Sequence, residues 1–253
     1  MIQNQLFLLG GHDLEMLTIS SVLKENNLLI IDHSLQWNNA YLSQYETEIK
    51  QYGNLFTWKI YGIELQEDIE IPNNYIRIDH HNDFSQNPSA LEQIMLMLNQ
   101  PLNRLHQLIA ANDAYYIPGM QRMGATLAEI EHIRYEDRKA QGVTLEEEEI
   151  SEKAIQENKE ICGDLIIVQA YSSRFSPICD RLYPYKKLLI YTNEELIYYG
   201  KGVSKLVAKY RNAVLNKKMF HGGGESGYLG TIKGAFSQEE IKQIVNQIKI
   251  IPL

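Results

Sequence analysis

The chain has 253 residues, a length that suits one large domain or two small ones. Its hydrophobic fraction of 44% and charged fraction of 22% are typical of globular proteins and exclude a disordered or fibrous chain. The formal net charge of −8 argues against binding along long nucleic acid, which requires many lysine and arginine side chains.

Short apolar strands alternate with helical segments through the first half of the chain. We predict strands over residues 6–9, 28–31, 56–63 and 75–78, and helices over residues 14–25 and 40–52. This alternation is typical of an α/β protein and predicts a doubly wound, mainly parallel sheet. In such sheets, ligands bind just beyond the carboxyl ends of the strands.

The residue types at these strand ends are the strongest functional signal. Each strand runs into an acidic residue, a histidine or both: His12 and Asp13, Asp32 and His33, Glu64, and Asp79, His80 and His81. Carboxylates and imidazoles without cysteine suit Mg²⁺ or Mn²⁺. Because clustered carboxylates repel one another, this sheet edge predicts either a metal pair or raised pKa values. Asp13 and Glu15 could supply one ligand to each ion, whereas a cap or turn role is favoured for Asp32 and His33.

Helices dominate the middle of the chain. We predict two of them over residues 90–99 and 103–111, the second ending at Asn112 and Asp113. Residues 124–160 are charged and helix-prone. Within them, Thr144 followed three residues later by Glu147 has the pattern of a capping box, which indicates the start of a helix.

The alternation of strands and helices restarts at Asp164. Strands are expected over residues 165–169, 187–191 and 195–199, and helices near residues 204–216 and 238–248. The predicted organisation is an N-terminal α/β domain over residues 1–125, a helical connector over residues 126–160 and a smaller α/β domain over residues 161–253.

A glycine-rich segment, His221-Gly222-Gly223-Gly224-Glu225, lies between the last two predicted helices. Because glycine has no Cβ, its backbone N–H groups can approach an anion closely. Just before this segment, residues 201–218 hold six basic side chains, the first being Lys201, and no acidic one. The basic stretch is either a wall that recruits phosphate beside the glycine loop or a solvated helix face.

Residues 76–81, which read Ile-Arg-Ile-Asp-His-His, resemble the signature of the DHH phosphoesterase superfamily. That superfamily includes RecJ-type nucleases, oligoribonucleases, exopolyphosphatases and manganese inorganic pyrophosphatases. Asp13-Leu14-Glu15 is similar to the family's Asp-x-Asp, Glu64 to its acidic residue before the signature, and Asp113 to a later aspartate. Residues 221–225 resemble its Gly-Gly-Gly-His loop, although position 225 is glutamate, and glutamate also replaces aspartate at positions 15 and 64.

The resemblance implies a centre of two Mn²⁺ or Mg²⁺ ions. Its ligands would be Asp13, Glu15, Glu64, His80 and Asp113, with Glu64 bridging the ions and His12 as an additional ligand.

The resemblance also implies roles beyond metal binding. His81 would face the scissile phosphate as hydrogen-bond donor or general acid, and Asp79 would orient an imidazole ligand. Substrate would be bound by His221, Gly222, Gly223, Gly224 and Lys201. We expect the glycine loop to face His81 across a cleft between the two domains.

Together these features predict a metal-dependent phosphoesterase. It would hydrolyse a phosphodiester or phosphoanhydride bond in a small nucleotide, dinucleotide or short oligonucleotide, using a water activated by two metal ions. The alternative is a catalytically degraded protein of the same fold that binds a nucleotide or a protein partner. The sequence leaves open whether the chain forms a homodimer.

The sequence also predicts a cytoplasmic protein without a membrane partner. No apolar run reaches the roughly 18 residues that span a bilayer, and the N-terminus lacks the positive charge of a signal peptide. The two cysteines, Cys162 and Cys179, are expected to be free thiols.

Overall fold

The computed structural model describes residues 4–223 and 227–251. The chain divides into two compact units, residues 1–142 and residues 143–253, which we call unit 1 and unit 2. The stretch predicted as a connector, residues 126–160, is shared between them. Its first helix, α5 (Leu127–Ala140), belongs to unit 1, and its second, α6 (Leu145–Asn158), belongs to unit 2.

Unit 1 is built on a sheet of four parallel strands in the order β2-β1-β3-β4. Leu9 pairs with Ile63, and Ile63 pairs with Ile78, so β1, β3 and β4 end level with one another. The residues that follow these three strands therefore meet at one edge of the sheet. The strands are β1 (Asn4–Leu9), β2 (Leu29–Ile31), β3 (Trp58–Ile63) and β4 (Tyr75–Ile78).

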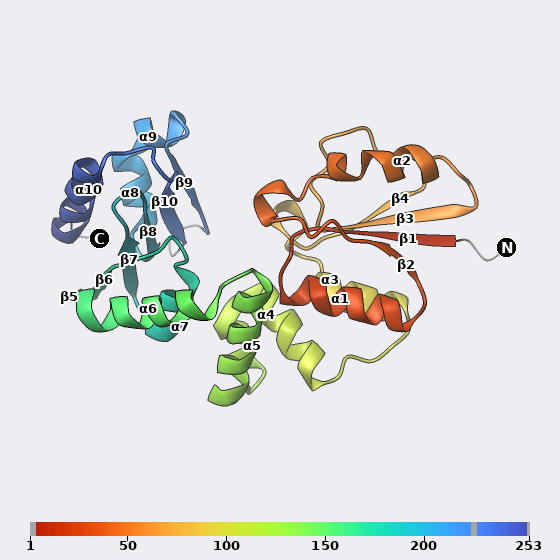
Figure 1. Ribbon diagram of the computed structural model, residues 1–253, viewed down its shortest axis with the longest axis horizontal. Helices are drawn as coiled ribbons and strands as arrows, with labels where there is room; N and C mark the ends of the chain where they lie inside the picture. The colour runs from red at the N-terminus through yellow and green to blue at the C-terminus, as the bar shows by residue number, and fades with distance from the viewer. Residues whose placement is uncertain (1–3, 224–226, 252–253) are drawn as a thin grey trace. The chain divides into compact units, whose positions relative to one another are not determined.

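Helices cover both faces of this sheet (Figure 1). The helices α1 (Leu14–Glu25) and α3 (Ala90–Met97) lie on one face, and α2 (Glu46–Tyr52) lies on the other. The predicted doubly wound, parallel α/β arrangement of the N-terminal part is confirmed.

The helix predicted over residues 40–52 is shorter than expected. Two 3₁₀ turns, η1 (Trp37–Asn39) and η2 (Leu42–Tyr45), precede α2. The backbone N–H of Leu42 donates to Gln66 O (2.8 Å), and that of Ser43 donates to Asp68 Oδ1 (2.9 Å). These hydrogen bonds to another segment anchor the start of the predicted helix, so regular α-helix begins only at residue 46.

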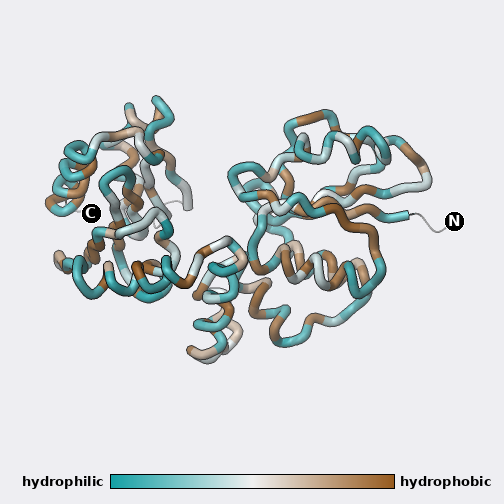
Figure 2. The backbone as a smooth tube through the Cα atoms, viewed as in Figure 1, coloured by the Kyte–Doolittle hydropathy of each residue, from teal (hydrophilic) through white to brown (hydrophobic). Residues whose placement is uncertain are grey.

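The core of unit 1 is centred on β1. Leu6, Phe7, Leu8 and Leu9 have no exposed surface, because helices cover both sides of the strand. Burying each such side chain contributes about 1.5–3 kcal/mol. Figure 2 shows this concentration of hydrophobic residues along the strands of the sheet.

The helix α4 (Arg104–Arg122) is longer than the helix predicted over residues 103–111. Tyr116 interrupts it with a φ of 56°, in the left-handed region. Pro118 explains the break, because proline lacks an N–H and clashes with the carbonyl four residues earlier, yet is tolerated in the first turn of the segment that follows. Asp113 therefore lies inside the first helical segment rather than after the helix.

The 3₁₀ turn η3 (Asn82–Phe84) lies earlier in the chain, after β4.

Unit 2 is a smaller α/β unit with six strands in the order β5-β6-β7-β8-β10-β9. Among the described strands, β6 and β7 pair in parallel and the other neighbours are antiparallel. The strands are β5 (Lys159–Cys162), β6 (Leu165–Gln169), β7 (Lys187–Tyr191), β8 (Leu196–Gly200), β9 (Met219–Gly222) and β10 (Tyr228–Thr231). The remaining helices are α7 (Ser176–Leu182), α8 (Val203–Lys209), α9 (Arg211–Leu215) and α10 (Gln238–Ile250).

The predicted smaller α/β domain at the C-terminal end is confirmed. The strands predicted over residues 165–169 and 187–191 coincide with β6 and β7, whereas the helix predicted over residues 204–216 is divided at Tyr210 into α8 and α9. Within the described parts of both units, no helix combines the length and hydrophobicity needed to cross a bilayer.

Candidate metal centre

The turn after β3 carries Glu64 against the end of β1. Close approach of the two segments requires glycine at position 10, because a Cβ there would lie 2.4 Å from the Glu64 carbonyl oxygen. Glu64 has a φ of 52°, which is uncommon for a residue with a side chain, and its N–H donates to Ile78 O (2.9 Å). Backbone strain of this kind is typical of functional sites.

Four side chains from three segments converge at this edge of unit 1. Glu64, His80, His81 and Asp113 each offer one ligand atom, and these atoms all lie within 4.8 Å of one another. His80 Nε2 lies 2.6 Å from Asp113 Oδ2 and 3.1 Å from Glu64 Oε1. Glu15 Oε2 is 3.8 Å from the same imidazole nitrogen. The structure thus brings five of the predicted site residues together.

The converging atoms have no hydrogen-bond partner in suitable geometry among the residues the structure describes. They are Glu15 Oε2, both carboxylate oxygens of Glu64, His80 Nε2, His81 Nε2 and Asp113 Oδ2, all buried from solvent. Buried polar atoms normally have a partner. Carboxylate oxygens and imidazole nitrogens without sulfur are the donor set that Mn²⁺ or Mg²⁺ accepts, so the residues present fit such an ion.

The electrostatics of the cluster also fit a cation. Burial, with the charges of Asp113 and Glu64, raises the pKa values of Asp13 and Glu15 well above their ordinary values. Burial opposes the charged form of His80, but the close carboxylates of Asp113 and Glu64 raise its pKa to about 10. The buried carboxylates therefore need a positive partner, which either a proton or a metal ion supplies.

Asp13 and Glu15 are held by backbone groups as well as by burial. Asp13 caps α1, with its Oδ1 accepting the Met16 N–H (2.8 Å). Glu15 Oε1 accepts the Leu91 N–H at the start of α3 (3.1 Å), which leaves Oε2 directed toward His80. Asp13 lies near the cluster without belonging to the four-residue group, and its role as a ligand stays a prediction.

Two further predicted site residues lie beside the cluster. His12 is outside the four-residue group, although its Nε2 is buried without a hydrogen-bond partner in the described part of the chain. Asp79 Oδ1 accepts the backbone N–H of His81 (2.8 Å), so Asp79 holds the turn of the signature through the main chain. The structure shows no contact of its carboxylate with an imidazole ring among the described residues.

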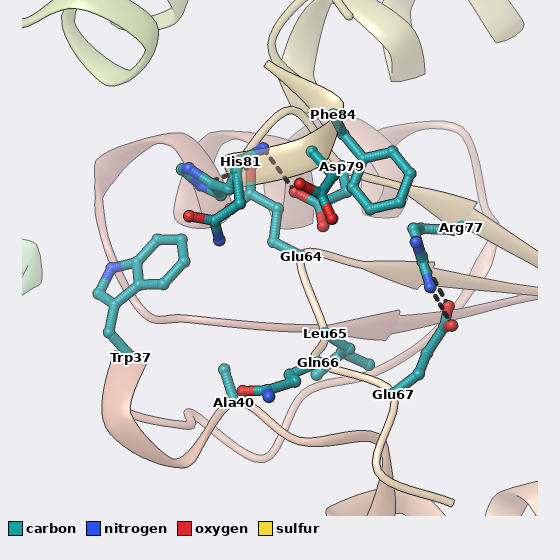
Figure 3. A pocket seen from close by; sticks show the side chains of 12 residues that line it. Trp37, Ala40, Glu64, Leu65, Gln66, Glu67, Arg77, Asp79, His81 and Phe84 are labelled. Carbon is teal, nitrogen blue, oxygen red and sulfur yellow. Dashed lines mark hydrogen bonds and ion pairs between the residues drawn. The ribbon is translucent and has the colours of Figure 1, made fainter. Parts of the chain in front are cut away.

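A cavity of about 630 Å³ opens beside the cluster and includes Glu64, Asp79 and His81 in its walls (Figure 3). The sequence-based reasoning missed the other side chains that form it, which include Trp37, Gln66, Arg77 and Phe84. Trp37 could have been predicted as part of the site, because it follows closely after the end of β2.

The predicted substrate-binding residues belong to unit 2. His221 and Gly222 lie in β9, opposite Leu229 and Tyr228 of β10, and Gly224 lies outside the described residues. Gly223 has a φ of 73°, which favours glycine. Lys201 lines a second cavity, of about 440 Å³, together with Tyr185, Lys186, Tyr199, Gly200, Gly227 and Tyr228. That the glycine loop faces His81 stays a prediction.

No protein-family model matches the sequence, and no curated protein matches it. The fold, in contrast, is similar to solved structures over nearly its whole length. A pGpG-specific phosphodiesterase, PggH from Vibrio cholerae, has a TM-score of 0.50 at 11% identity, with 98% of each chain covered. The DHH domain of a member of the s1p family of ribosomal proteins has a TM-score of 0.54 at 9% identity, covering 99% of this chain and 88% of that one.

At such low identity the likeness concerns the fold. The similarity spans both units, and Asp79, His80 and His81, which resemble the Asp-His-His signature, follow β4 at the edge where the side chains of the cluster converge. The fold of the chain is therefore similar to that of a DHH domain.

Proposed function

We propose that the protein is a metal-dependent phosphoesterase acting on a small nucleotide, dinucleotide or short oligonucleotide. The observation that carries this proposal is the convergence of Glu64, His80, His81 and Asp113 with buried atoms that lack hydrogen-bond partners among the described residues. The similar fold of a pGpG-specific phosphodiesterase supports it by analogy. The net charge of −8 favours a short substrate over long nucleic acid.

Glu64, His80, Asp113 and Glu15 would hold the Mn²⁺ or Mg²⁺. Glu64 would be the ligand shared by two ions, as the resemblance implies, because both of its carboxylate oxygens are buried without a hydrogen bond of suitable geometry to another described residue. A bound ion would lower the pKa of an attacking water and offset negative charge developing on the phosphoryl oxygens.

His81 would handle a proton in this reaction. Its side chain is 35% exposed against 5% for His80, and it lines the cavity beside the cluster. Its Nε2 lies 3.6 Å from Glu64 Oε1, and this carboxylate raises the pKa of His81. A protonated His81 would donate to a phosphoryl oxygen or pass its proton to the leaving oxygen.

The first prediction tests these roles by hydrolysis of pyrophosphate, dinucleotides and short oligonucleotides in Mn²⁺. Asp113→Ala should lower kcat/KM by at least about 10- to 100-fold, the loss expected when even a group that only supports a metal ligand is removed. His81→Ala should lower it by about 10²–10⁴-fold through loss of proton transfer. His132→Ala, which removes an exposed imidazole from α5, is the matched control and should leave hydrolysis unchanged.

Two outcomes would contradict the proposal. Hydrolysis that survives both substitutions would place the reaction elsewhere in the chain. Binding of one of these compounds without hydrolysis above the level of the double variant would instead favour a catalytically degraded binding protein.

A further inference from the structure

The cavity beside the metal centre has walls that the proposed reaction leaves without a role. It shares Glu64 and His81 with the cluster, so it would receive the group next to a phosphoester bound at the cluster. The other walls lie within unit 1 as well (Figure 3). They include Trp37, Gln66, Glu67, Arg77, Asp79 and Phe84.

Trp37 forms a fixed aromatic wall of this cavity. Its indole meets the His81 ring edge-on, with ring centroids 5.0 Å apart and an angle of 87° between the planes. A Cβ on Gly11 would lie 2.4 Å from the indole, so the ring rests directly on the Gly11 backbone. Trp37 is nevertheless 42% exposed. An aromatic ring held in place with an open face is suited to stacking on a flat ligand.

The opposite wall carries a cation whose charge is already balanced. Arg77 Nε donates to Glu67 Oε1 (2.7 Å), and its Nη2 pairs with the second oxygen of the same carboxylate. The guanidinium also lies over the Phe84 ring, 4.3 Å from its centroid. Arg77 is therefore engaged on two sides, which disfavours its use as a phosphate ligand.

The remaining charge of the cavity is mainly acidic. Glu64, Asp79 and Asp83 line it, with His81 at the metal end. Asp79 Oδ1 accepts the backbone N–H of His81, and Oδ2 takes no part in that hydrogen bond. An acidic wall repels a second phosphate but accepts hydrogen bonds from the N–H groups of a neutral ring.

We infer that this cavity binds a nucleobase of the substrate, stacked on Trp37 and read through its N–H donors by the acidic wall. The inference rests on the proposed function, since the phosphoester at the metal centre brings the base to the cavity. Bases are commonly recognised by aromatic stacking together with hydrogen bonds to the Watson–Crick edge. Guanine, whose edge presents adjacent N–H donors to a carboxylate, is the base that fits best.

The test compares the affinities of GMP, UMP, guanosine and ribose 5-phosphate by calorimetry in Mn²⁺. GMP should bind at least about tenfold more tightly than ribose 5-phosphate, and more tightly than UMP, as expected from base stacking. Trp37→Ala should abolish that advantage, whereas Trp37→Phe should largely retain it. Phe56→Ala is the matched control, because Phe56 is 93% exposed and precedes β3 at the end opposite Glu64.

Fluorescence gives an independent readout. The chain has two tryptophans, Trp37 and Trp58, so Trp58→Phe leaves Trp37 as the only reporter. GMP and guanosine should quench its emission, and ribose 5-phosphate should not.

The outcomes separate this inference from the proposed function. If GMP and ribose 5-phosphate bind with equal affinity and His80→Ala abolishes the binding of both, the phosphate site at the metal centre stands and the base pocket is overturned. Binding of guanosine measured by calorimetry and lost in Trp37→Ala would support the base pocket even if no hydrolysis were found. Absence of binding by all four compounds would overturn both.

Discussion

At the scale of single residues, Tyr45 ties the edge of the site to the core. Its side chain has no exposed surface, and its hydroxyl donates to Leu9 O at the end of β1. The same hydroxyl accepts the His33 N–H (3.1 Å), and the His33 ring stacks on the phenol with centroids 4.3 Å apart. The carbonyl that precedes Gly10 and Gly11 is thereby held in place.

The second prediction is that Tyr45→Phe lowers the free energy of unfolding by about 1–3 kcal/mol, because the buried Leu9 carbonyl and the His33 N–H lose their hydrogen-bond partner. Burial raises the pKa of Tyr45 to about 12. Its contribution is therefore fully present below about pH 10 and is lost as the pH rises toward about 12. Denaturant unfolding of both forms from pH 8 to 11 measures this, and an unchanged stability at pH 8 would contradict it.

At the scale of secondary-structure elements, α5 connects two helices beside the candidate metal centre. Arg134 Nη1 donates to Asn112 Oδ1 (3.0 Å), next to Asp113 in α4, and to Asp137 Oδ2 (2.7 Å). Asp137 Oδ1 in turn accepts the Leu14 N–H at the start of α1 (3.3 Å). These contacts hold the helix that carries Asp113 against the helix that begins after Asp13.

The third prediction is that Arg134→Met destabilises unit 1 by about 3–5 kcal/mol, because it leaves the buried Asp137 without its cation. Arg122→Met is the matched control. Arg134 lies over the Tyr116 ring, 4.6 Å from its centroid. Arg122 likewise lies over the Tyr115 ring, at 4.8 Å, but on an exposed part of α4, so its loss should cost less than about 1 kcal/mol.

Thermal unfolding of both arginine variants measures this difference. If the two substitutions lower the free energy of unfolding equally, the buried contacts of Arg134 contribute nothing beyond an exposed cation–π pair. A positioning role of Arg134 further predicts weaker Mn²⁺ binding by Arg134→Met, which the control should not show.

At the scale of the whole molecule, stability depends on how buried negative charge is balanced. Asp13, Glu15 and Glu64 are each less than 5% exposed, and they lie close to Asp113 in a chain of net charge −8. Protonated His80 offsets part of this charge, as its raised pKa shows. A divalent ion would offset more of it and should therefore bind the folded protein in preference to the unfolded chain.

The fourth prediction is that Mn²⁺ raises the Tm of the full chain and that a chelator reverses the effect. At a concentration one hundred times the Kd, the gain is about 2.7 kcal/mol, which corresponds to several degrees for a chain of this size. His80→Ala should lose most of this gain. An equal rise of Tm in that variant would show that the ion binds elsewhere.

The sequence by itself determined the parallel α/β sheet and the edge at which the site lies. Apolar periodicity and strand ends are local properties, and parallel strands necessarily bring their carboxyl ends to the same edge. For this reason the order of the strands along the chain is enough to predict that Glu64 and His80, which follow neighbouring strands, meet at that edge.

Only the tertiary structure decided the surroundings of that edge. The placement of Trp37 on Gly11 and the contact of Arg134 with Asn112 depend on packing between segments far apart in the chain. Local propensities carry no record of such contacts, because tertiary packing overrides them. The candidate ligand residues were therefore readable from the sequence, whereas the cavity beside them was not.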